Sequence, residues 1–248
     1  VSLLATFVHF YAAENLPYNI VIVASAEEES SGKNGLNSVL KSLPELECAI
    51  VGEPTLMQLA IAEKGLLVLD VKIKGTPSHA AHQNEDNALY KTIPVMEWFK
   101  NYTFEKVSEQ LGPVKMTVTQ INAGKQHNVV PSECDIVVDI RVNDCYTNHE
   151  ILAIVQEHVN AEVMPRSMNL SSSSIPENHG LVQAGIALGR STYGSPTLSD
   201  QSVLSCKSLK LGPGDTLRSH SADEFIYLNE IEEGIDLYIK ILSDFLKQ

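Results

Sequence analysis

Three adjacent glutamates are the residues of this sequence best suited to chemistry. Glu27, Glu28 and Glu29 follow an apolar run at residues 20–26. Neighbouring carboxylates repel one another, so a fold that gathers them at the end of a buried strand usually offsets their charge with a cation. The triplet therefore indicates a metal site with one carboxylate free to act as a base. A solvated acidic turn is the alternative for an isolated triplet.

Two other motifs carry residue types that bind metals. Glu53 precedes Pro54, which restrains the backbone and helps to hold a ligand carboxylate in place. The glycine-rich turn at residues 212–214 leads to His220, and an acidic pair follows that histidine. Histidine is a common zinc ligand, although a lone surface histidine has no metal more often than it has one.

A fourth motif suits substrate binding. Residues 124–131 contain Asn128, and the segment that follows contains Arg141 in a strand-like pattern. The planar guanidinium of an arginine can bind a substrate carboxylate with two hydrogen bonds. An ion pair between Arg141 and Asp139 or Asp144 is an equally good interpretation of these residues.

The elements that must position these residues begin with α/β alternation. Residues 1–14 and 35–43 are expected to form helices, and residues 20–25 and 48–51 are expected to form buried strands. Short β-branched strands of this kind are typical of a doubly wound parallel sheet. Ligands of such sheets bind at the carboxyl ends of the strands, where both acidic motifs fall.

The middle of the chain has a different pattern. Residues 67–74 alternate apolar and polar side chains with period two, as half-exposed antiparallel strands do. The expected order is strand 67–74, helix 87–100, strands 114–121 and 135–142, helix 148–160 and a short strand at 168–171. This β-α-β-β-α-β order predicts a ferredoxin-like module.

The first pattern returns near residue 181. Residues 181–191 and 228–246 are expected to be helical, and 202–211 a helix-to-strand transition. The predicted fold class is therefore α/β, with a doubly wound catalytic domain formed by residues 1–65 and 172–248. An α+β module at residues 66–171 is inserted into it.

Composition narrows the function classes. The 248 residues carry a formal net charge of −13, which argues against nucleic acid as a partner. The four cysteines lie far apart without CxxC spacing, which favours a reduced, cytoplasmic protein. We expect no membrane partner, because the sequence has no apolar run long enough for a membrane span and no signal peptide.

Taken in order, these motifs resemble those of the co-catalytic zinc amidohydrolases and exopeptidases. This family includes acetylornithine deacetylase, succinyl-diaminopimelate desuccinylase and carboxypeptidase G. The resemblance covers nearly the whole chain and implies a doubly wound catalytic domain with an inserted dimerisation domain. The Gly-Glu-Pro-Thr sequence at 52–55, and the acidic motif flanked by Ala and Ser, resemble acetylornithine deacetylase most.

The resemblance implies roles for the acidic residues and the histidine. It implies a site with two zinc ions, or cobalt in their place, and a bridging water. Glu28 matches the general base, Glu29 a ligand of one metal, Glu53 a ligand of the other, and His220 the last ligand. Glu27 stands where the family often has aspartate, and its own role stays open.

The resemblance also assigns roles within the insert. His79 matches a histidine that reaches the partner subunit's active site and stabilises the oxyanion, with His82 as a competing candidate. Asn128 and Arg141 match substrate-binding positions, Arg141 as the carboxylate anchor. Family members commonly form homodimers through this insert.

The function implied is hydrolysis of the amide bond of N-acetyl- or N-succinyl-ornithine or -citrulline, in arginine biosynthesis. Succinyl-diaminopimelate desuccinylase, or a di- or tripeptidase of the same family, is the enzymatic alternative. The family's His-x-Asp motif and bridging Asp would lie upstream of Val1, so we expect this polypeptide alone to be inactive. The alternative of another class is an inactive fragment or a non-catalytic dimerisation or binding module.

Overall fold

The computed structural model describes residues 1–30, 32 and 34–247, and it divides the chain into two compact units. The second unit, Lys64–Ser172, interrupts the first, which is built from the chain before and after it. Each unit has a hydrophobic core of its own. The fold class expected from the sequence, an α/β unit carrying an inserted α+β module, is confirmed.

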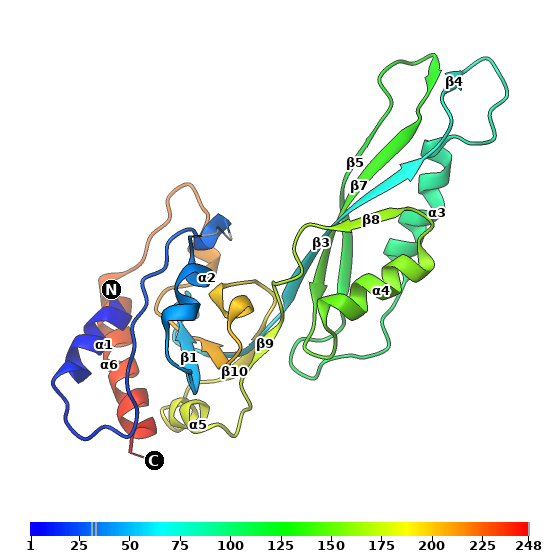
Figure 1. Ribbon diagram of the computed structural model, residues 1–248. Coiled ribbons are helices and arrows are strands. Elements are labelled where there is room, and N and C mark those ends of the chain that lie inside the picture. The colour runs from blue at the N-terminus through cyan, green and yellow to red at the C-terminus, as the bar shows by residue number, and fades with distance from the viewer. Residues whose placement is uncertain (31, 33, 248) are drawn as a thin grey trace. The chain divides into compact units, whose positions relative to one another are not determined.

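The second unit is an antiparallel sheet covered by two helices. Its main elements are β3 (Gly65–Lys74), α3 (Ala88–Asn101), β5 (Lys115–Ala123), β7 (Glu133–Val142), α4 (Asn148–His158) and β8 (Glu162–Pro165). The strands lie in the order β5-β7-β3-β8, and each neighbouring pair is antiparallel. This is the ferredoxin-like arrangement, and both helices pack on the same face of the sheet (Figure 1).

Period-two alternation decides which face of this sheet is buried. Leu67 and Leu69 of β3 have no exposed surface, and they pair with Ile140 and Val138 of β7. Polar side chains set the helix starts. Asn87 accepts a hydrogen bond from the backbone of α3, and a reciprocal capping box begins α4.

The final strand of this unit differs from the prediction. Residues 168–171 were expected to form it, but the strand is β8, whose Val163 pairs with Val71 of β3 and faces the core. The carbonyls of Met168 and Leu170 instead accept hydrogen bonds from the Asn148 side chain. The Leu170 carbonyl also accepts from the backbone N–H of Leu66, but no strand ladder extends through this segment among the described residues.

The first unit contains a mixed sheet in the order β1-β11-β2-β10, with β9 paired to β2. β1 and β11 run parallel, β2 and β10 run parallel, and β11 and β2 are antiparallel, so the sheet is mixed. Its strands are β1 (Cys48–Val51), β2 (Leu59–Glu63), β9 (Ser173–Ser174), β10 (Thr192–Ser195) and β11 (Lys207–Lys210).

Helices cover this sheet. They are α1 (Ser2–Tyr11), α2 (Leu36–Val39), α5 (Gly180–Ala187) and α6 (Leu228–Phe245), with short 3-10 turns η1 (Glu28–Ser30), η2 (Leu40–Ser42), η3 (Asp200–Val203) and η4 (Thr216–Arg218). α1 lies beside α6, although the two come from opposite ends of the chain (Figure 1). Among the helices of the described residues, none has the length and apolar character needed to cross a membrane.

The predicted strand at residues 20–25 is wrong. The run has no regular secondary structure and pairs with no strand among the described residues, and Val21 and Val23 are 45% and 39% exposed. β-branched residues favour strands chiefly by packing against neighbouring strands, and no strand of the described residues pairs with this run. Together with β1 it instead lines a cavity of about 1160 Å³ in the first unit.

The core of the second unit can be tested with one substitution. Val138→Ala removes a fully buried side chain, so we expect a loss of about 2 kcal/mol of unfolding free energy from lost burial and the cavity left behind. Trp98, the single tryptophan of the chain, packs against this core. Its fluorescence during urea unfolding therefore reports on this unit.

Val107→Ala is the matched control, because Val107 is 59% exposed in the same unit. It should leave the midpoint of the tryptophan transition nearly unchanged. Equal losses in the two variants would contradict the assignment of Val138 to the core.

Candidate active site

Two interlocked loops hold Glu53 in place. It follows β1, and Gly212 follows the neighbouring strand β11. The Gly212 carbonyl accepts hydrogen bonds from the backbone N–H groups of Thr55 and Met57, and its own N–H donates to Thr55 Oγ1. A Cβ at Gly212 would lie 2.4 Å from the Glu53 carbonyl oxygen, so only glycine fits here.

Glu53 itself is a half-buried carboxyl in an acidic setting. Burial raises its pKa to about 7, and repulsion from Glu28, Glu63 and Glu29 adds to the effect. The positive charge of Lys210 opposes this shift. The chain thus keeps a carboxyl at the end of β1 that titrates near neutral pH in the absence of a further cation.

The first glutamate of the triplet shapes the turn. Glu27 has a positive φ of 57°, and its carboxylate accepts hydrogen bonds from the backbone N–H and the side-chain amide of Asn34. These hydrogen bonds lower the pKa of Glu27. A turn-forming role therefore accounts for this residue, whose duty the sequence left open.

The second glutamate has the environment of a base. Glu28 begins η1 and is half-buried. Burial raises its pKa, with further increases from Glu29, Asp200 and Glu63. A carboxylate with a raised pKa is a better proton acceptor near neutral pH than an ordinary exposed one.

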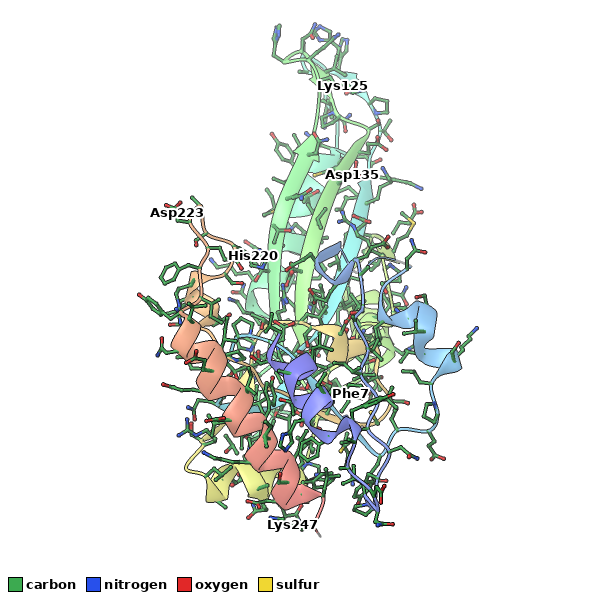
Figure 2. The ribbon with its side chains drawn as sticks, turned by 90° about the vertical axis from the view of Figure 1, so that its left-hand side faces the viewer. Phe7, Lys125, Asp135, His220, Asp223 and Lys247 are labelled. Atoms are coloured by element: carbon green, nitrogen blue, oxygen red, sulfur yellow. The ribbon has the colours of Figure 1, made fainter. Side chains whose placement is uncertain are left out.

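The third glutamate meets the predicted histidine. Glu29 Oε2 lies 3.6 Å from His220 Nε2, and both side chains are largely exposed. His220 has a positive φ of 56°, and its backbone N–H donates to Glu224 Oε2. Strained backbone of this kind in a non-glycine residue is commonly found at functional sites. Figure 2 shows His220 and Asp223 on the loop that leads into α6.

An ion pair anchors the base of that loop. The guanidinium of Arg218 donates to both carboxylate oxygens of Glu230, with less than a fifth of either side chain exposed. The rings of Phe225 and Tyr227 lie against the guanidinium, and Glu230 also caps the first turn of α6. The position of His220 therefore depends on a tie between η4 and α6.

Glu29, Glu53 and His220 have side chains of the types that bind metals. Glu29 Oε2 and His220 Nε2 lie 3.6 Å apart, and Glu53 lines the same cavity as Glu28 and Glu29. Within residues 1–30, 32 and 34–247, however, no three His, Cys, Asp or Glu side chains form a group that could hold a metal. The described residues therefore do not complete the two-metal centre that the sequence resemblance implies.

The remaining predicted site residues belong to the second unit. His79 lies on β4 (Ser78–His79), which pairs with β6 (Val129–Val130), and its ring Nδ1 accepts from the Ala81 N–H. Its competitor His82 is close, with ring centroids 5.7 Å apart. The Asn128 carbonyl accepts a hydrogen bond from the backbone N–H of Ala80, next to His79.

Arg141 makes the contact that the sequence offered as an alternative to substrate binding. Its guanidinium donates to both oxygens of Asp139, at 2.8 and 3.1 Å. Both side chains are about one third exposed. An anchoring role for Arg141 would therefore require it to share its donors between Asp139 and a substrate.

Several residues of the first unit escaped the sequence analysis. Asp200 accepts a hydrogen bond from Ser25 Oγ at 2.6 Å, and Lys210 forms a buried ion pair with Glu63. The available signal was the placement of a lysine and a glutamate inside short apolar strands, because buried charges are normally paired. Asp200 had no comparable signal in its sequence neighbourhood.

The inserted unit has a recognisable counterpart. Residues 61–166 match the model of the peptidase dimerisation domain, and this range overlaps most of the second unit.

The whole chain is similar to known hydrolases. A putative succinyl-diaminopimelate desuccinylase of Mycobacterium tuberculosis is 24% identical over 257 residues, covering 96% of this chain and 72% of that protein. A probable carboxypeptidase of Aspergillus flavus is 26% identical, covering 93% of this chain and 60% of that protein. These relatives are named for desuccinylase and peptidase activities, whereas the sequence motifs favoured acetylornithine deacetylase.

Solved structures agree on the fold. The aminopeptidase PepT from Bacillus cereus superposes with a TM-score of 0.76 at 16% identity, covering 100% of this chain and 70% of that one. The YXEP protein of Bacillus subtilis, described as a dinuclear metal binding peptidase of the M20 family, gives a TM-score of 0.72 at 14% identity, covering 99% and 69%. The chain thus has the mixed α/β fold of M20 peptidases, with the dimerisation domain inserted.

Glu53 makes the stability of the metal-free chain depend on pH. Because its pKa is raised from 4.5 to about 7, the folded chain retains a proton there that the unfolded chain has released. Stability should therefore fall as pH rises through this interval and stay lower above it. Glu53→Gln should abolish that fall and gain about 1–2 kcal/mol at about pH 8, a figure reduced for solvent screening of this partly exposed group.

Differential scanning calorimetry in chelator, at both ends of the interval, measures this effect. Glu232→Gln, an exposed glutamate of α6, is the matched control and should reproduce the parent profile. A parent-like pH profile for Glu53→Gln would show that burial does not raise the pKa of Glu53.

Proposed function

We propose that this chain forms the catalytic part of a metal-dependent amidohydrolase, which cleaves the amide bond of an N-acyl amino acid. The observation that carries the proposal is Glu28, a half-buried carboxyl with a raised pKa beside the Glu29–His220 contact. The similarity of the chain to desuccinylases and peptidases supports the same reaction class, because both kinds of enzyme hydrolyse amide bonds.

In this proposal Glu28 accepts a proton from the attacking water and returns it to the leaving amine. Glu29, Glu53 and His220 are the residues offered to two zinc ions, and cobalt is the alternative metal. These three residues are an incomplete set of ligands for two metal ions, so the roles proposed here are those of the side chains themselves. The dinuclear character of the YXEP protein supports a two-metal site in this chain as well.

Substrate binding is assigned to the inserted unit. His79 stabilises the oxyanion, with Asn128 and Arg141 binding the substrate and Arg141 holding its carboxylate. The match to a peptidase dimerisation domain supports a homodimer formed through residues 64–172, in which His79 serves the partner's site. The free state of all four cysteines is compatible with the reduced cytoplasm, where we place the protein.

The names of the relatives rank the substrates. An N-succinyl amino acid such as succinyl-diaminopimelate comes first, because desuccinylases are among the relatives that cover most of this chain. N-acetyl- or N-succinyl-ornithine and -citrulline, which would place the enzyme in arginine biosynthesis, come second on the motif resemblance. Short peptides come third, on the likeness to peptidases.

The chain spans 72% of the Mycobacterium desuccinylase and 64% of the Ruegeria desuccinylase. We propose that the 248-residue polypeptide alone turns over substrate poorly and that any longer natural form of the protein is the active one. A non-catalytic dimerisation or binding module is the competing proposal.

A substrate panel separates these proposals. The 248-residue chain, and any longer natural form, are incubated with zinc and each of the three substrate classes, and the released amine is quantified. We expect release from succinyl-diaminopimelate to have the highest kcat/KM. Release from the ornithine substrates alone would favour the deacetylase alternative, and no release from any substrate by any form would support the non-catalytic module.

Substitution of the proposed base is the sharper test. Glu28→Gln in the active form should lower kcat by about 10²-fold or more, the usual contribution of a general base, while the metal content stays near that of the parent. Metal content is measured by elemental analysis after gel filtration. Glu232→Gln should leave both values unchanged. If Glu28→Gln loses metal and Glu29→Gln retains it, the roles of the two residues are exchanged.

A further inference from the structure

A fully buried ion pair lies in the sheet of the first unit. Lys210 Nζ on β11 is 2.9 Å from Glu63 Oε2 on β2, with side chains only 3% and 0% exposed. Removing two charges from water costs several kcal/mol per ion, and an isolated pair seldom returns that cost in stability. A pair retained at this depth is therefore best explained by what it holds in place.

Both charges are satisfied by one segment, residues 195–203. Glu63 accepts hydrogen bonds from the backbone N–H and the Oγ of Ser199, at 3.1 and 2.7 Å. The Lys210 ammonium donates to the carbonyl oxygen and the Oγ1 of Thr197, both at 3.0 Å. The ion pair thus forms hydrogen bonds with Thr197 and Ser199, just before η3 begins.

Residues 195–203 place Asp200 near the acidic triplet. Asp200 is the first residue of η3, and Ser199 caps that turn by accepting from the Gln201 N–H. The Asp200 carboxylate accepts from Ser25 Oγ, which lies three residues before Glu28. Residues 20–25 pair with no strand among the described residues, and this hydrogen bond links the segment before the triplet to η3.

We propose that Glu63 and Lys210 are positioning residues that fix residues 195–203, so that Asp200 holds Ser25 and with it the segment bearing Glu28. The pair reaches the triplet through a continuous series of contacts from the sheet interior to the loop. Its importance for catalysis rests on the proposed function of Glu28, whereas its effect on the loop does not.

Hydrogen–deuterium exchange in chelator tests the positioning without substrate or metal. The double variant Glu63→Met/Lys210→Met replaces both charges with apolar side chains of similar size, a change that buried pairs often tolerate without loss of stability. We expect a thermal midpoint near that of the parent. Exchange in peptides covering residues 20–30 and 195–203 should rise up to about tenfold, the effect of losing a hydrogen bond's worth of local protection.

Two further variants locate the effect. Ser25→Ala removes the last link, so exchange should rise in residues 20–30 and stay unchanged in residues 195–203. Lys207→Met is the matched control, because Lys207 is an exposed lysine on the same strand. It should change exchange in neither peptide, and peptides from residues 64–172 should match the parent in every variant.

Parent-like exchange of residues 20–30 in the folded double variant would overturn the proposal, because the pair would then contribute stability alone. Parent-like exchange in Ser25→Ala would overturn the link through Asp200. If the double variant unfolds, Ser25→Ala and Asp200→Asn, which alter only the exposed end of the series, decide the link. Raised exchange in a protein that hydrolyses no substrate would uphold the positioning and reject the proposed function.

Discussion

Repulsion among carboxyl groups is the constraint on which the first unit depends. Burial raises the pKa values of Glu28 and Glu53. Repulsion from Glu29, Asp200 and Glu63 adds to the rise for Glu28, and repulsion from Glu28, Glu63 and Glu29 adds to it for Glu53, while the buried ammonium of Lys210 opposes both. Raised pKa values favour the protonated forms of these carboxyls when no cation is bound. This cluster of carboxyls therefore favours binding of a positive charge, such as a metal ion or a cationic group of a substrate.

The candidate site residues Glu53, Glu29 and His220 are held with unequal rigidity. Glu53 sits in backbone that is locked to the glycine turn after β11 by several hydrogen bonds. His220 and Glu29, in contrast, are exposed and touch each other from two irregular loops. One side of the site is therefore built into the sheet, and the other can adjust when a ligand enters.

Local pattern predicted most elements of the second unit because its contacts follow simple rules. Alternation in β3 and β7 and the caps at Asn87 and Thr147 each specify structure from neighbouring residues. The first unit was harder. The run at 20–25 has the composition of a buried strand, but strand formation depends on a partner that sequence composition does not supply. β2 and β10 were missed because short strands carry little periodicity.

The candidate site divides in the same way between local and distant causes. Glu28, Glu29, Glu53 and His220 were predicted from motifs that resemble those of a known family, and the structure brings Glu29 and His220 to within 3.6 Å of each other. The contacts of Asp200, Glu63 and Lys210 join residues that are far apart in the sequence. Ser199 is 136 residues from Glu63, and Ser25 is 175 residues from Asp200. No local sequence pattern encodes such pairings. Motifs therefore identified candidates for the chemistry, and only the structure identified the contacts that hold them.

The buried ion pair lies where the chain enters the inserted unit. The second unit has its own core, and the chain passes into it from the first unit at Glu63, whose carboxylate also pairs with Lys210. The strand that carries the buried charge is thus also the strand from which the insert departs. A buried, well-satisfied carboxylate fixes the end of β2 more firmly than an apolar residue could, because it bonds to a defined set of donors. The same pair can therefore serve the acidic loop and the exit of the chain into its inserted unit.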